Sequence, residues 1–344
     1  MTKVLLTGGS GFIAAHVLEQ LLAKGHSVIT TVRSEEKAEQ IRKAYPSKSA
    51  DELSVVIVPD IAKEGAFDEV VKTPGIEVVL HTASPFHFKF SDPKTELIDP
   101  ALIGTSSIIK AIARSAPSVR RVVITSSFAA IMDETKGSDP NTTYTEASWN
   151  PVTIDQIYDS PATAYRASKK LAEKSAWDFV ADPANDAKFD VVTINPPMVF
   201  GPVVHHLAGL QNINTSNARV VDLLQGKWKD EIATTGQAII WVDVRDVAAA
   251  HIRAGLEIPE AGGKRLFTTA GLFSNAEIVE IVRKNFPEYK DKLPGPEVKG
   301  GELPAESERF KFDNSATTEL LKIKWISLEK SIVDAVNSLK AHGA

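Results

Sequence analysis

The sequence predicts an α/β fold in which a doubly wound parallel sheet carries helices on both faces. Short apolar runs rich in β-branched residues alternate with longer helical patterns through the first half of the chain. Continuous apolar strands are typical of a parallel sheet that is buried on both faces. A glycine cluster directly after the first apolar run, at residues 8–11, fits the tight strand-to-helix turn of such a fold.

Each predicted element is bounded by turn-forming residues or by a change of periodicity. Strands are expected at residues 4–7, 27–32, 54–58, 78–81, 122–125 and 190–195. Helices are expected at residues 13–23, 35–44, 105–115 and 162–180. The alternation corresponds to the repeated βα units of a doubly wound fold.

The regular alternation fades after Asn195, where two prolines end the strand. A strand at 239–242 and a helix at 244–256 follow, and Asp243 stands where a helix N-cap is expected. An amphipathic helix is expected at 327–341. We therefore expect a Rossmann cofactor-binding domain and a smaller C-terminal substrate-binding lobe. The domain comprises residues 1–195, completed by residues 236–257, and the lobe comprises residues 196–235 and 258–344.

Composition restricts the function classes. The chain has 344 residues, of which 43% are hydrophobic and 24% charged, so it can bury a full core. Its formal net charge of −5 argues against nucleic-acid binding. Because it has no cysteine, it forms no disulfide, thiolate metal site or cysteine nucleophile. No apolar stretch approaches the roughly 18 residues of a membrane span, so a cytoplasmic protein is expected.

The first strand runs into a glycine-rich segment with the spacing G-x-x-G-x-x-A. It comprises Thr7, Gly8, Gly9, Ser10, Gly11, Phe12 and Ile13, followed by Ala14. A strand that turns at once into a helix presents the helix amides to a pyrophosphate, and side chains there would block the approach. The segment is therefore interpreted as a dinucleotide-binding loop. A nucleophile elbow around Ser10 does not fit, because Phe12 stands where that motif needs glycine.

The end of the second strand indicates which dinucleotide is bound. An NAD-binding unit usually has an acidic residue there, which binds the ribose 2′-hydroxyl. This chain has Arg33 instead, with Lys37 one helical turn later. Two cations favour a 2′-phosphate, so NADP(H) is the expected cofactor. The alternative is a solvated basic surface beside the acidic residues of segment 35–39.

Tyr165 and Lys169 stand four residues apart, on one face of the helix expected at 162–180. An ammonium group beside a phenol lowers the pKa of the tyrosine, which could then give a proton to a carbonyl oxygen. By itself the pattern Y-x-x-x-K is more often a surface pair. Here, however, the segment VVITSS at 122–127 ends a central strand in hydroxyl residues, at the edge where open α/β sheets bind ligands.

Several segments, in this order along the chain, resemble one enzyme family. They are TGGSGFIA at 7–14, HTAS at 81–84, TSS at 125–127, YRASK at 165–169, NPPMVFGP at 195–202 and WVDVRDVAAAH at 241–251. Together they resemble the extended short-chain dehydrogenases/reductases, and most closely the dihydroflavonol-reductase-like branch. That branch includes fungal NADPH-dependent methylglyoxal and carbonyl reductases. The resemblance extends over residues 3–290.

The resemblance implies a catalytic triad of Ser127, Tyr165 and Lys169. Tyr165 would protonate the carbonyl oxygen, Ser127 would orient it, and Lys169 would lower the pKa of the tyrosine and bind the nicotinamide ribose. Ser126 is the alternative serine, because strand alternation points only one of the two into the site. Further cofactor contacts are implied at Asp60, Ile61, Thr82, Ala83, Ser84, Pro196 and Val199.

The substrate pocket is expected in loops beyond the strand ends, where apolar residues gather. The candidates for its wall are Phe86, Phe128, Met132, Pro197 and Val199. For Phe86 and Phe128 an ordinary core position is equally compatible with the sequence. No metal site is predicted, because the adjacent His205 and His206 point apart and no acidic partner is spaced to join them.

The leading function is therefore NADPH-dependent reduction of an aldehyde or ketone to an alcohol. A nucleotide-sugar epimerase or dehydratase of the same superfamily is the first alternative, although dehydratases have Asp-Glu where this chain has Ser126 and Ser127. A non-catalytic NADP-sensing protein is the second, although such proteins usually lose the Tyr or the Lys. The expected partner is a small carbonyl compound, with no nucleic acid and no membrane, and the chain is expected to be a monomer or homodimer.

Overall fold

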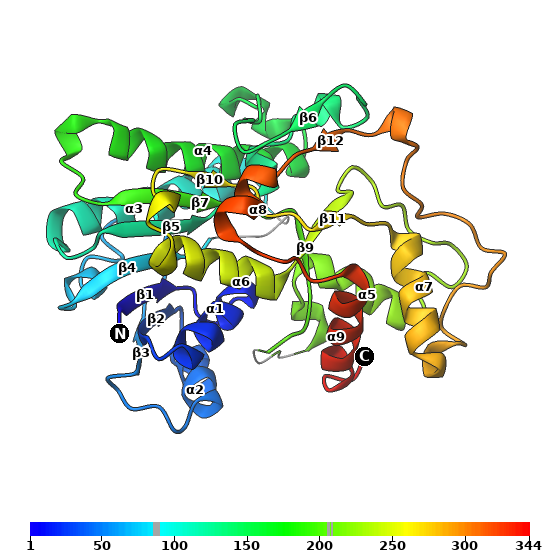
Figure 1. The fold of residues 1–344 in the computed structure, drawn as a ribbon, viewed down its shortest axis with the longest axis horizontal. Coiled ribbons are helices and arrows are strands. Elements are labelled where there is room, and N and C mark those ends of the chain that lie inside the picture. Colours follow the sequence, from blue (N-terminus) through cyan, green and yellow to red (C-terminus); the bar gives the residue numbers. More distant parts are fainter. Residues whose placement is uncertain (85–89, 205–206, 208) are drawn as a thin grey trace.

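The computed structural model describes residues 1–84, 90–204, 207 and 209–344. The largest element of the protein is a seven-stranded sheet of order β3-β2-β1-β4-β5-β7-β10 (Figure 1). Its strands are β1 (Lys3–Thr7), β2 (Ser27–Val32), β3 (Leu53–Ile57), β4 (Ile76–His81), β5 (Arg121–Thr125), β7 (Asp190–Ile194) and β10 (Arg265–Leu266). Every pairing in this sheet is parallel. Because the strand order reverses between β1 and β4, the carboxyl ends of these two strands flank the crevice where such sheets bind ligands.

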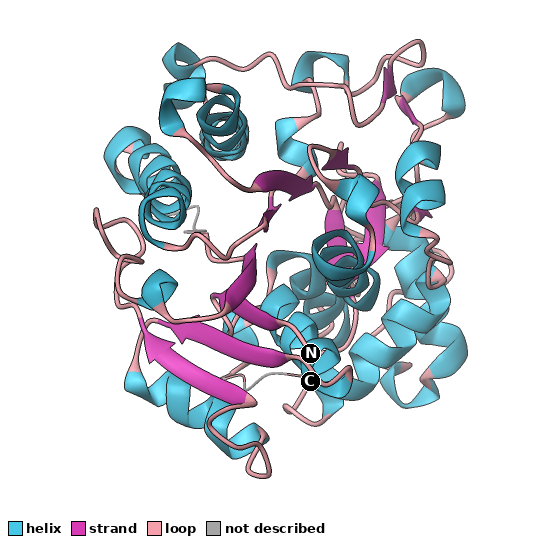
Figure 2. Cartoon of the chain, turned by 60° about the vertical axis from the view of Figure 1, so that its left-hand side comes forward, coloured by secondary structure: helices cyan, strands magenta, loops and turns pink. Residues whose placement is uncertain are grey.

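Helices cover both faces of the sheet (Figure 2). One face carries α1 (Phe12–Ala23), α2 (Glu35–Ala44) and α6 (Val244–Ile252), and the other carries α3 (Asp99–Ser115) and α4 (Pro161–Ala181). Successive residues of β1 alternate between the two cores: Val4 and Leu6 belong to the first and Leu5 to the second. All three side chains are fully buried. Burial on both faces explains why these strands read as continuous apolar runs.

The C-terminal part of the chain forms a smaller lobe, at the right of Figure 1. Its three-stranded sheet contains β8 (Met198–Phe200), β9 (Ile240–Asp243) and β11 (Gly271–Leu272), with β9 in the centre. The core of this lobe is completed by α5 (Thr215–Leu224), α7 (Asn275–Asn285) and α9 (Leu328–Lys340). The described chain also contains the strand pair β6 (Thr143–Tyr144) and β12 (Lys311–Phe312), helix α8 (Ser315–Leu321) and several short 3-10 and π-helical segments.

The predicted fold class is confirmed, since the large sheet is parallel and covered on both faces. The strand at 27–32 and the helix at 35–44 have the predicted bounds, whereas α3 begins at Asp99 rather than at residue 105. Asp243 is the N-cap of α6, and its Oδ1 accepts the amide of Arg245 at 2.8 Å. An N-cap carboxylate of this kind satisfies an amide that the helix itself leaves without a partner.

The chain alternates between the Rossmann domain and the C-terminal lobe more often than the expected domain boundaries imply. β10, from the segment 258–344, is the seventh strand of the large sheet rather than part of the lobe. β9, from the segment 236–257, pairs with β8 and β11 in the small sheet. The helix of the segment 236–257, α6, packs beside α1 on one face of the large sheet. The chain therefore passes between the two sheets several times.

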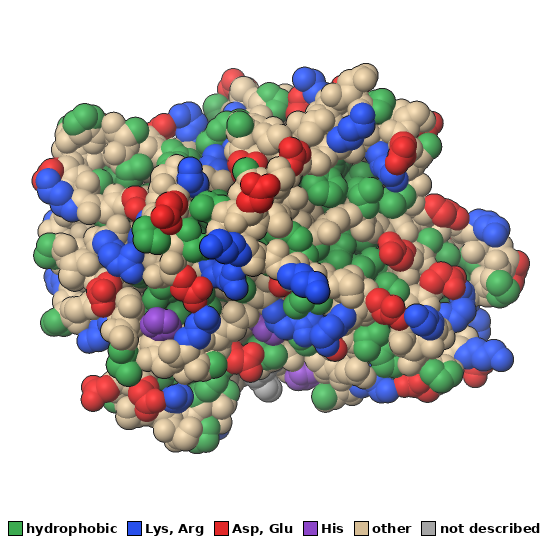
Figure 3. Space-filling view, viewed as in Figure 1, with side chains coloured by type: hydrophobic (Ala, Val, Ile, Leu, Met, Phe, Trp, Pro, Cys, Tyr) green, Lys and Arg blue, Asp and Glu red, His purple; other side chains and the backbone are tan. Residues whose placement is uncertain are grey.

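Basic and acidic side chains are interspersed over the face of the molecule shown in Figure 3. Within the described residues, no helix is both long enough and apolar enough to cross a membrane. The same part of the chain contains no group of three or more His, Cys, Asp or Glu side chains that could hold a metal ion. His205 and His206 lie outside the described residues.

Candidate active site

The glycine segment forms the turn between β1 and α1. Gly8 has a φ of 74°, and a Cβ atom added to it would lie 3.0 Å from the backbone of Ala83. Gly9 packs against β2, where an added Cβ would lie 2.0 Å from Oγ1 of Thr30. Gly11 is the N-cap of α1 and has no side chain that could cap the helix. The amino end of α1, which carries a partial positive charge, therefore suits an anionic group such as a pyrophosphate.

The ends of β1 and β4 form the floor of the crevice. Oγ1 of Thr7 lies 2.8 Å from Nδ1 of His81 and accepts the amide of Ala83 at 3.1 Å. Thr82 donates from Oγ1 to the backbone oxygen of Thr7 at 2.5 Å. Burial, together with the charge of Lys169, lowers the pKa of His81 to about 4. The ring is therefore neutral at pH 7 and holds the two strand ends together.

Arg33 and Lys37 lie where β2 ends and α2 begins. The side chain of Arg33 is exposed, whereas Lys37 is half-buried. Ser34, between them, caps α2 by accepting the amide of Lys37 at 3.4 Å. Lys37 lines a pocket together with Gly9 and Ser10 of the glycine turn. This places Lys37 beside the glycine turn, and its contact with a phosphate stays a prediction.

The sequence left open whether Arg33 and Lys37 form only a solvated basic surface beside the acidic residues of α2. The hydrogen bonds of those acidic residues are relevant to this alternative. Glu35 and Glu39 both accept hydrogen bonds from Nη1 of Arg42, at 2.5 and 2.7 Å. These two carboxylates are therefore engaged by a different cation than Arg33 or Lys37. This arrangement favours an anionic ligand for the latter two over neutralisation by their own helix.

The segment after β3 lies at the same carboxyl edge of the sheet. Oδ1 of Asp60 accepts the amide of Ala62 at 2.9 Å. The side chain of Ile61 lies beside α3, where a Cβ atom added to Gly104 would lie 3.6 Å from it. The turn that carries both residues is thus fixed by a local hydrogen bond and by packing. The implied contact of Asp60 and Ile61 with the cofactor stays a prediction.

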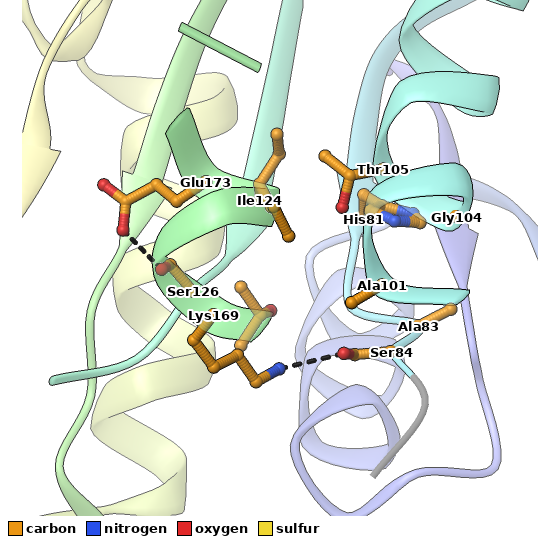
Figure 4. A pocket seen from close by; sticks show the side chains of 12 residues that line it. His81, Ala83, Ser84, Ala101, Gly104, Thr105, Ile124, Ser126, Lys169 and Glu173 are labelled. Atoms are coloured by element: carbon orange, nitrogen blue, oxygen red, sulfur yellow. Dashed lines mark hydrogen bonds between the residues drawn. The ribbon is translucent and has the colours of Figure 1, made fainter. Parts of the chain in front are cut away.

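Tyr165 and Lys169 lie one turn apart on α4. The helix begins just before them, where Oγ of Ser160 accepts the amide of Thr163 at 3.0 Å. Nζ of Lys169 lies 5.9 Å from the centre of the Tyr165 ring. The same atom donates a hydrogen bond of 2.9 Å to Oγ of Ser84, which follows β4 (Figure 4). The lysine therefore spans the crevice from α4 to the loop that begins at the end of β4.

Ser126 and Ser127 turn to opposite sides at the end of β5. Ser127 is half-buried and makes a side-chain hydrogen bond with Tyr165. Ser126 is buried, and its Oγ donates to Oε2 of Glu173 at 2.5 Å. Strand alternation thus directs Ser127 to the tyrosine and Ser126 away from it. The geometry favours Ser127 over Ser126 as the serine of the site.

Burial shifts the pKa values of both Tyr165 and Lys169. Desolvation raises the pKa of Tyr165, and the hydrogen bond with Ser127 offsets part of this effect. Desolvation lowers the pKa of Lys169 to about 8. The sequence predicted a lowered pKa for the tyrosine, but in the structure the effect of burial is larger. At pH 7 the phenol therefore holds its proton and most Lys169 side chains are charged, which suits a proton donor.

The predicted wall of the substrate pocket falls partly in the core. Phe128 and Met132 are buried, and the ring of Phe128 stacks on Phe267 with a centroid distance of 5.2 Å. Phe128 also packs against Tyr144 and Phe310. For Phe128 the core position that the sequence left open is therefore the observed one. Phe86 lies outside the described residues.

The segment after β7 joins the large sheet to the small lobe. The backbone oxygen of Pro196 accepts the amide of Phe128 at 2.9 Å, so this segment lies beside the end of β5. Val199 is buried, and its amide donates to Oγ of Ser216 at 2.9 Å. Pro197 is half-buried. The implied contacts of this segment with cofactor and substrate stay predictions.

A pocket with mixed polar and apolar walls is lined in part by the side chain of Lys169 (Figure 4). Its polar lining consists of His81, Ser84, Thr105, Thr125, Ser126 and Glu173. Glu173, which lies one turn after Lys169 on α4, is not part of the motifs that predict the site from the sequence. The available signal was the spacing of Tyr165, Lys169 and Glu173, which places all three on one helix face.

Most of the chain matches one known protein family. Residues 4–267 match the family described as "NAD dependent epimerase/dehydratase family". The chain belongs to this family. The resemblance to the extended short-chain dehydrogenases/reductases is therefore confirmed. The matched segment includes the glycine turn, both serines at the end of β5, and α4.

Two relatives that are similar over nearly the whole chain carry names of reductases. "Ketoreductase azaE" of Aspergillus niger is 44% identical, with 98% of this chain and 97% of the relative covered. "NADPH-dependent methylglyoxal reductase GRE2" of Saccharomyces cerevisiae is 36% identical, with 98% of each chain covered. The expectation of a reductase-like branch agrees with both relatives.

Solved structures of this family superpose closely. The crystal structure of Gre2 from Candida albicans in complex with NADPH has a TM-score of 0.92 and 38% identity, with 100% of each chain covered. A UDP-glucose 4-epimerase from Bifidobacterium longum has a TM-score of 0.71 and 21% identity, with 99% of this chain and 98% of the epimerase covered. At that identity the epimerase shares the fold, and the likeness carries no statement about activity.

Proposed function

We propose that this chain is an NADPH-dependent reductase that converts aldehydes and ketones to alcohols. The observation that carries the proposal is the cluster of Ser127, Tyr165 and Lys169 at the carboxyl edge of the sheet. The cluster is assembled from β5 and α4, and Lys169 is bonded to Ser84 at the end of β4. The relatives named as a ketoreductase and as an NADPH-dependent methylglyoxal reductase support the same activity.

Each residue of the cluster has a separate task. The hydroxyl of Ser127 is bonded to the phenol, so an oxygen held by Ser127 lies within reach of the same proton. Tyr165 keeps its proton at neutral pH and gives it to the carbonyl oxygen as the alcohol forms. The charge of Lys169 then stabilises the phenolate that remains. All three groups act on the oxygen side of the substrate.

The residues of the crevice fit NADPH. The start of α1, where the N-cap Gly11 has no side chain, suits a pyrophosphate. Gly8 and Gly9 allow the turn to pack closely against Ala83 and Thr30. Arg33 and Lys37 suit the 2′-phosphate, since a guanidinium and an ammonium both donate to phosphate oxygens. When bound, NADPH supplies the hydride that reduces the carbonyl carbon. The chain itself binds, orients and provides the proton.

The experiment is oxidation of NADPH by the purified chain with a panel of small aldehydes and ketones that includes methylglyoxal. We expect turnover by the wild-type chain and none by the variant Tyr165→Phe, because the alkoxide cannot form without its proton. Fluorescence titration should show that the variant still binds NADPH, since the phenol contributes little to cofactor binding. This binding control separates a lost proton donor from a lost cofactor site.

The other outcomes identify the alternatives. Conversion of a UDP-sugar without net use of NADPH would contradict the proposal and indicate an epimerase. Binding of NADPH without turnover of any carbonyl compound would contradict it in favour of a sensor. We expect the substrate to be a small carbonyl compound, and we expect a monomer or homodimer in the cytoplasm.

A further inference from the structure

Glu173 is a carboxylate that is buried beside the candidate site. Its exposed fraction is 1%. It lies on α4, one turn after Lys169 and two turns after Tyr165. A buried carboxylate destabilises the folded chain unless other groups bond to it. Its partners therefore decide what the residue does.

One oxygen of Glu173 accepts hydrogen bonds from two residues that are adjacent to Ser127, Ser126 in the sequence and Asn195 in space. Oε2 accepts Oγ of Ser126 at 2.5 Å and Nδ2 of Asn195 at 2.7 Å. Ser126 is the residue before Ser127 in the chain. Nδ2 of Asn195 also donates to the backbone oxygen of Ser127, at 3.3 Å. Glu173 is thus bonded to the groups on either side of the backbone that carries the Ser127 hydroxyl.

The other oxygen of Glu173 is anchored to the sheet. Oε1 accepts Nε of Arg265, from β10, at 2.6 Å and Oγ1 of Thr193, from β7, at 3.1 Å. Arg265 is itself fixed, because its guanidinium stacks 3.8 Å from the centre of the Trp149 ring. One carboxylate therefore connects α4 with the ends of β5 and β10 and with β7. Charge-assisted hydrogen bonds of this kind are strong and directional.

We propose that Glu173 is a positioning residue for the reduction, which fixes Ser126 and Asn195 and so directs the Ser127 hydroxyl at Tyr165. The inference rests on the proposed function, in which Ser127 orients the carbonyl oxygen. The hydrogen bonds described for Glu173 go to Ser126, Trp177, Thr193, Asn195 and Arg265, so it acts on Ser127 through these neighbours. It couples the helix that carries the proton donor to the strand that carries the orienting serine.

The opposite ends of the same strands provide a matched control. Arg121, at the start of β5, forms an ion pair with Asp190, at the start of β7, through Nε at 2.6 Å. The side chain of Arg121 is 5% exposed and that of Asp190 is 39% exposed. Loss of this pair should reduce stability without moving Ser127, because the pair lies at the far end of the strands from the site.

The variants are Glu173→Gln, Ser126→Ala and Asp190→Asn. In Glu173→Gln the guanidinium of Arg265 attracts the amide oxygen. The amide nitrogen is then left facing Nδ2 of Asn195, so two donors meet and that bond is lost. Ser126→Ala removes the hydrogen bond between Ser126 and Glu173 with only a small change of side-chain volume. This variant therefore tests the inference if Glu173→Gln does not fold.

The first measurement is the 13C chemical shift of the Tyr165 ring carbon that bears the hydroxyl, at neutral pH without substrate. The signal is assigned by its loss in Tyr165→Phe. We expect this chemical shift to change in Glu173→Gln and in Ser126→Ala, and to remain at the wild-type value in Asp190→Asn. This measurement needs no activity, so the inference can fail or succeed independently of the proposed function.

The second measurement is kinetic. We expect kcat for carbonyl reduction to fall by about tenfold to a hundredfold in Glu173→Gln, the range for misplaced reacting groups, with KM for NADPH within about twofold of wild type. Asp190→Asn should keep the wild-type kcat. If the tyrosine signal stays in place in both Glu173→Gln and Ser126→Ala, Glu173 does not position Ser127 and the inference is overturned.

Discussion

Nζ of Lys169 and Oγ of Ser84 are joined by a hydrogen bond of 2.9 Å. The bond connects α4 to the end of β4, next to the strand that carries the glycine turn. Lys169 is half-buried, and the Ser84 hydroxyl that accepts this bond carries no charge to balance the ammonium group. The lysine is therefore held in place by a neutral partner while burial disfavours its charge, which makes its protonation sensitive to pH near neutrality.

The rate of reduction should depend on pH through Lys169. Burial lowers the pKa of this residue to about 8, so the ammonium form predominates below that pH and is lost above it. A neutral lysine cannot stabilise the phenolate of Tyr165, so kcat should fall as the pH rises through about 8. The measurement is kcat for one carbonyl substrate at saturating NADPH, over a series of buffers of equal ionic strength.

The variant Lys169→Arg is the control for this assignment. A guanidinium stays charged throughout this pH range. Its kcat is expected to be lower than wild type at neutral pH, because the longer planar group does not reproduce the bond to Ser84. The fall near pH 8, however, should disappear. A fall with the same midpoint in the variant would mean that another group titrates.

The two serines at the end of β5 should differ in their effect on rate. Ser127→Ala removes the hydroxyl that is bonded to Tyr165, and should lower kcat by about 10²–10³, as for one lost donor to the reacting oxygen. Ser126→Ala removes a bond to Glu173 and should lower kcat less. Comparison of kcat for both variants with the same ketone checks the order. The reverse order would mean that Ser126 orients the substrate.

The sequence predicted most of the large sheet because burial on both faces leaves a strong local pattern. The apolar strands Val4–Leu6 and Val122–Ile124 can be identified without any knowledge of their neighbours. β10 could not, because it has two residues and one of them is an arginine. A strand this short has no periodicity, and its place in the sheet depends on pairing with β7.

The candidate site was predictable where its residues act through local spacing. Tyr165 and Lys169 lie one turn apart in the sequence of a single helix, and strand alternation separates Ser127 from Ser126. Glu173 was missed because its chief partner, Arg265, is 92 residues distant in the chain. Long-range partners decide whether such a carboxylate is buried, and a helical pattern alone does not show them.

Arg33 should determine the preference for NADPH over NADH. It stands where NAD enzymes have an acidic residue, and its side chain is exposed at the end of β2. A 2′-phosphate carries close to two negative charges, whereas NADH has only a hydroxyl at that position. Arg33→Ala should lower kcat/KM for NADPH by about tenfold, or about 1.4 kcal/mol, and leave NADH nearly unchanged.

The salt concentration must be fixed in this comparison, because exposed charges are screened. Both cofactors are measured with wild type and variant under the same conditions. Equal losses for NADPH and NADH would assign Arg33 to the structure rather than to the phosphate. A wild-type preference for NADH would contradict the interpretation of the β2 end.

Phe128 should affect stability more than substrate choice. Its ring stacks on Phe267 and packs against Tyr144 and Phe310. Phe128→Ala should lower the free energy of unfolding by about 3–5 kcal/mol, as expected for truncating a buried aromatic ring. The ranking of ketones of different bulk should change little, measured as kcat/KM relative to wild type. A reordered ranking with unchanged stability would place Phe128 in the pocket wall instead.

His251 should make the protein less stable in mild acid. Its ring is fully buried between Oγ1 of Thr125, 2.7 Å from Nε2, and the backbone oxygen of Val247, 2.8 Å from Nδ1. Burial lowers its pKa to about 4, from an ordinary value of 6.5. Between these values the unfolded chain binds the proton more tightly, so the free energy of unfolding rises with pH over this range. The contribution of His251 at pH 7.5 exceeds that at pH 5 by about 2 kcal/mol.

The measurement is urea unfolding at about pH 5 and about pH 7.5 for the wild-type chain, His251→Gln and Asp246→Asn. His251→Gln should reduce the difference in stability between the two pH values, because the amide does not titrate. Burial raises the pKa of Asp246 to about 6, so its contribution has the opposite sign and favours the folded chain at the lower pH. Asp246→Asn should therefore widen the same difference. If His251→Gln leaves the difference unchanged, the protonation of His251 does not drive the loss of stability in acid.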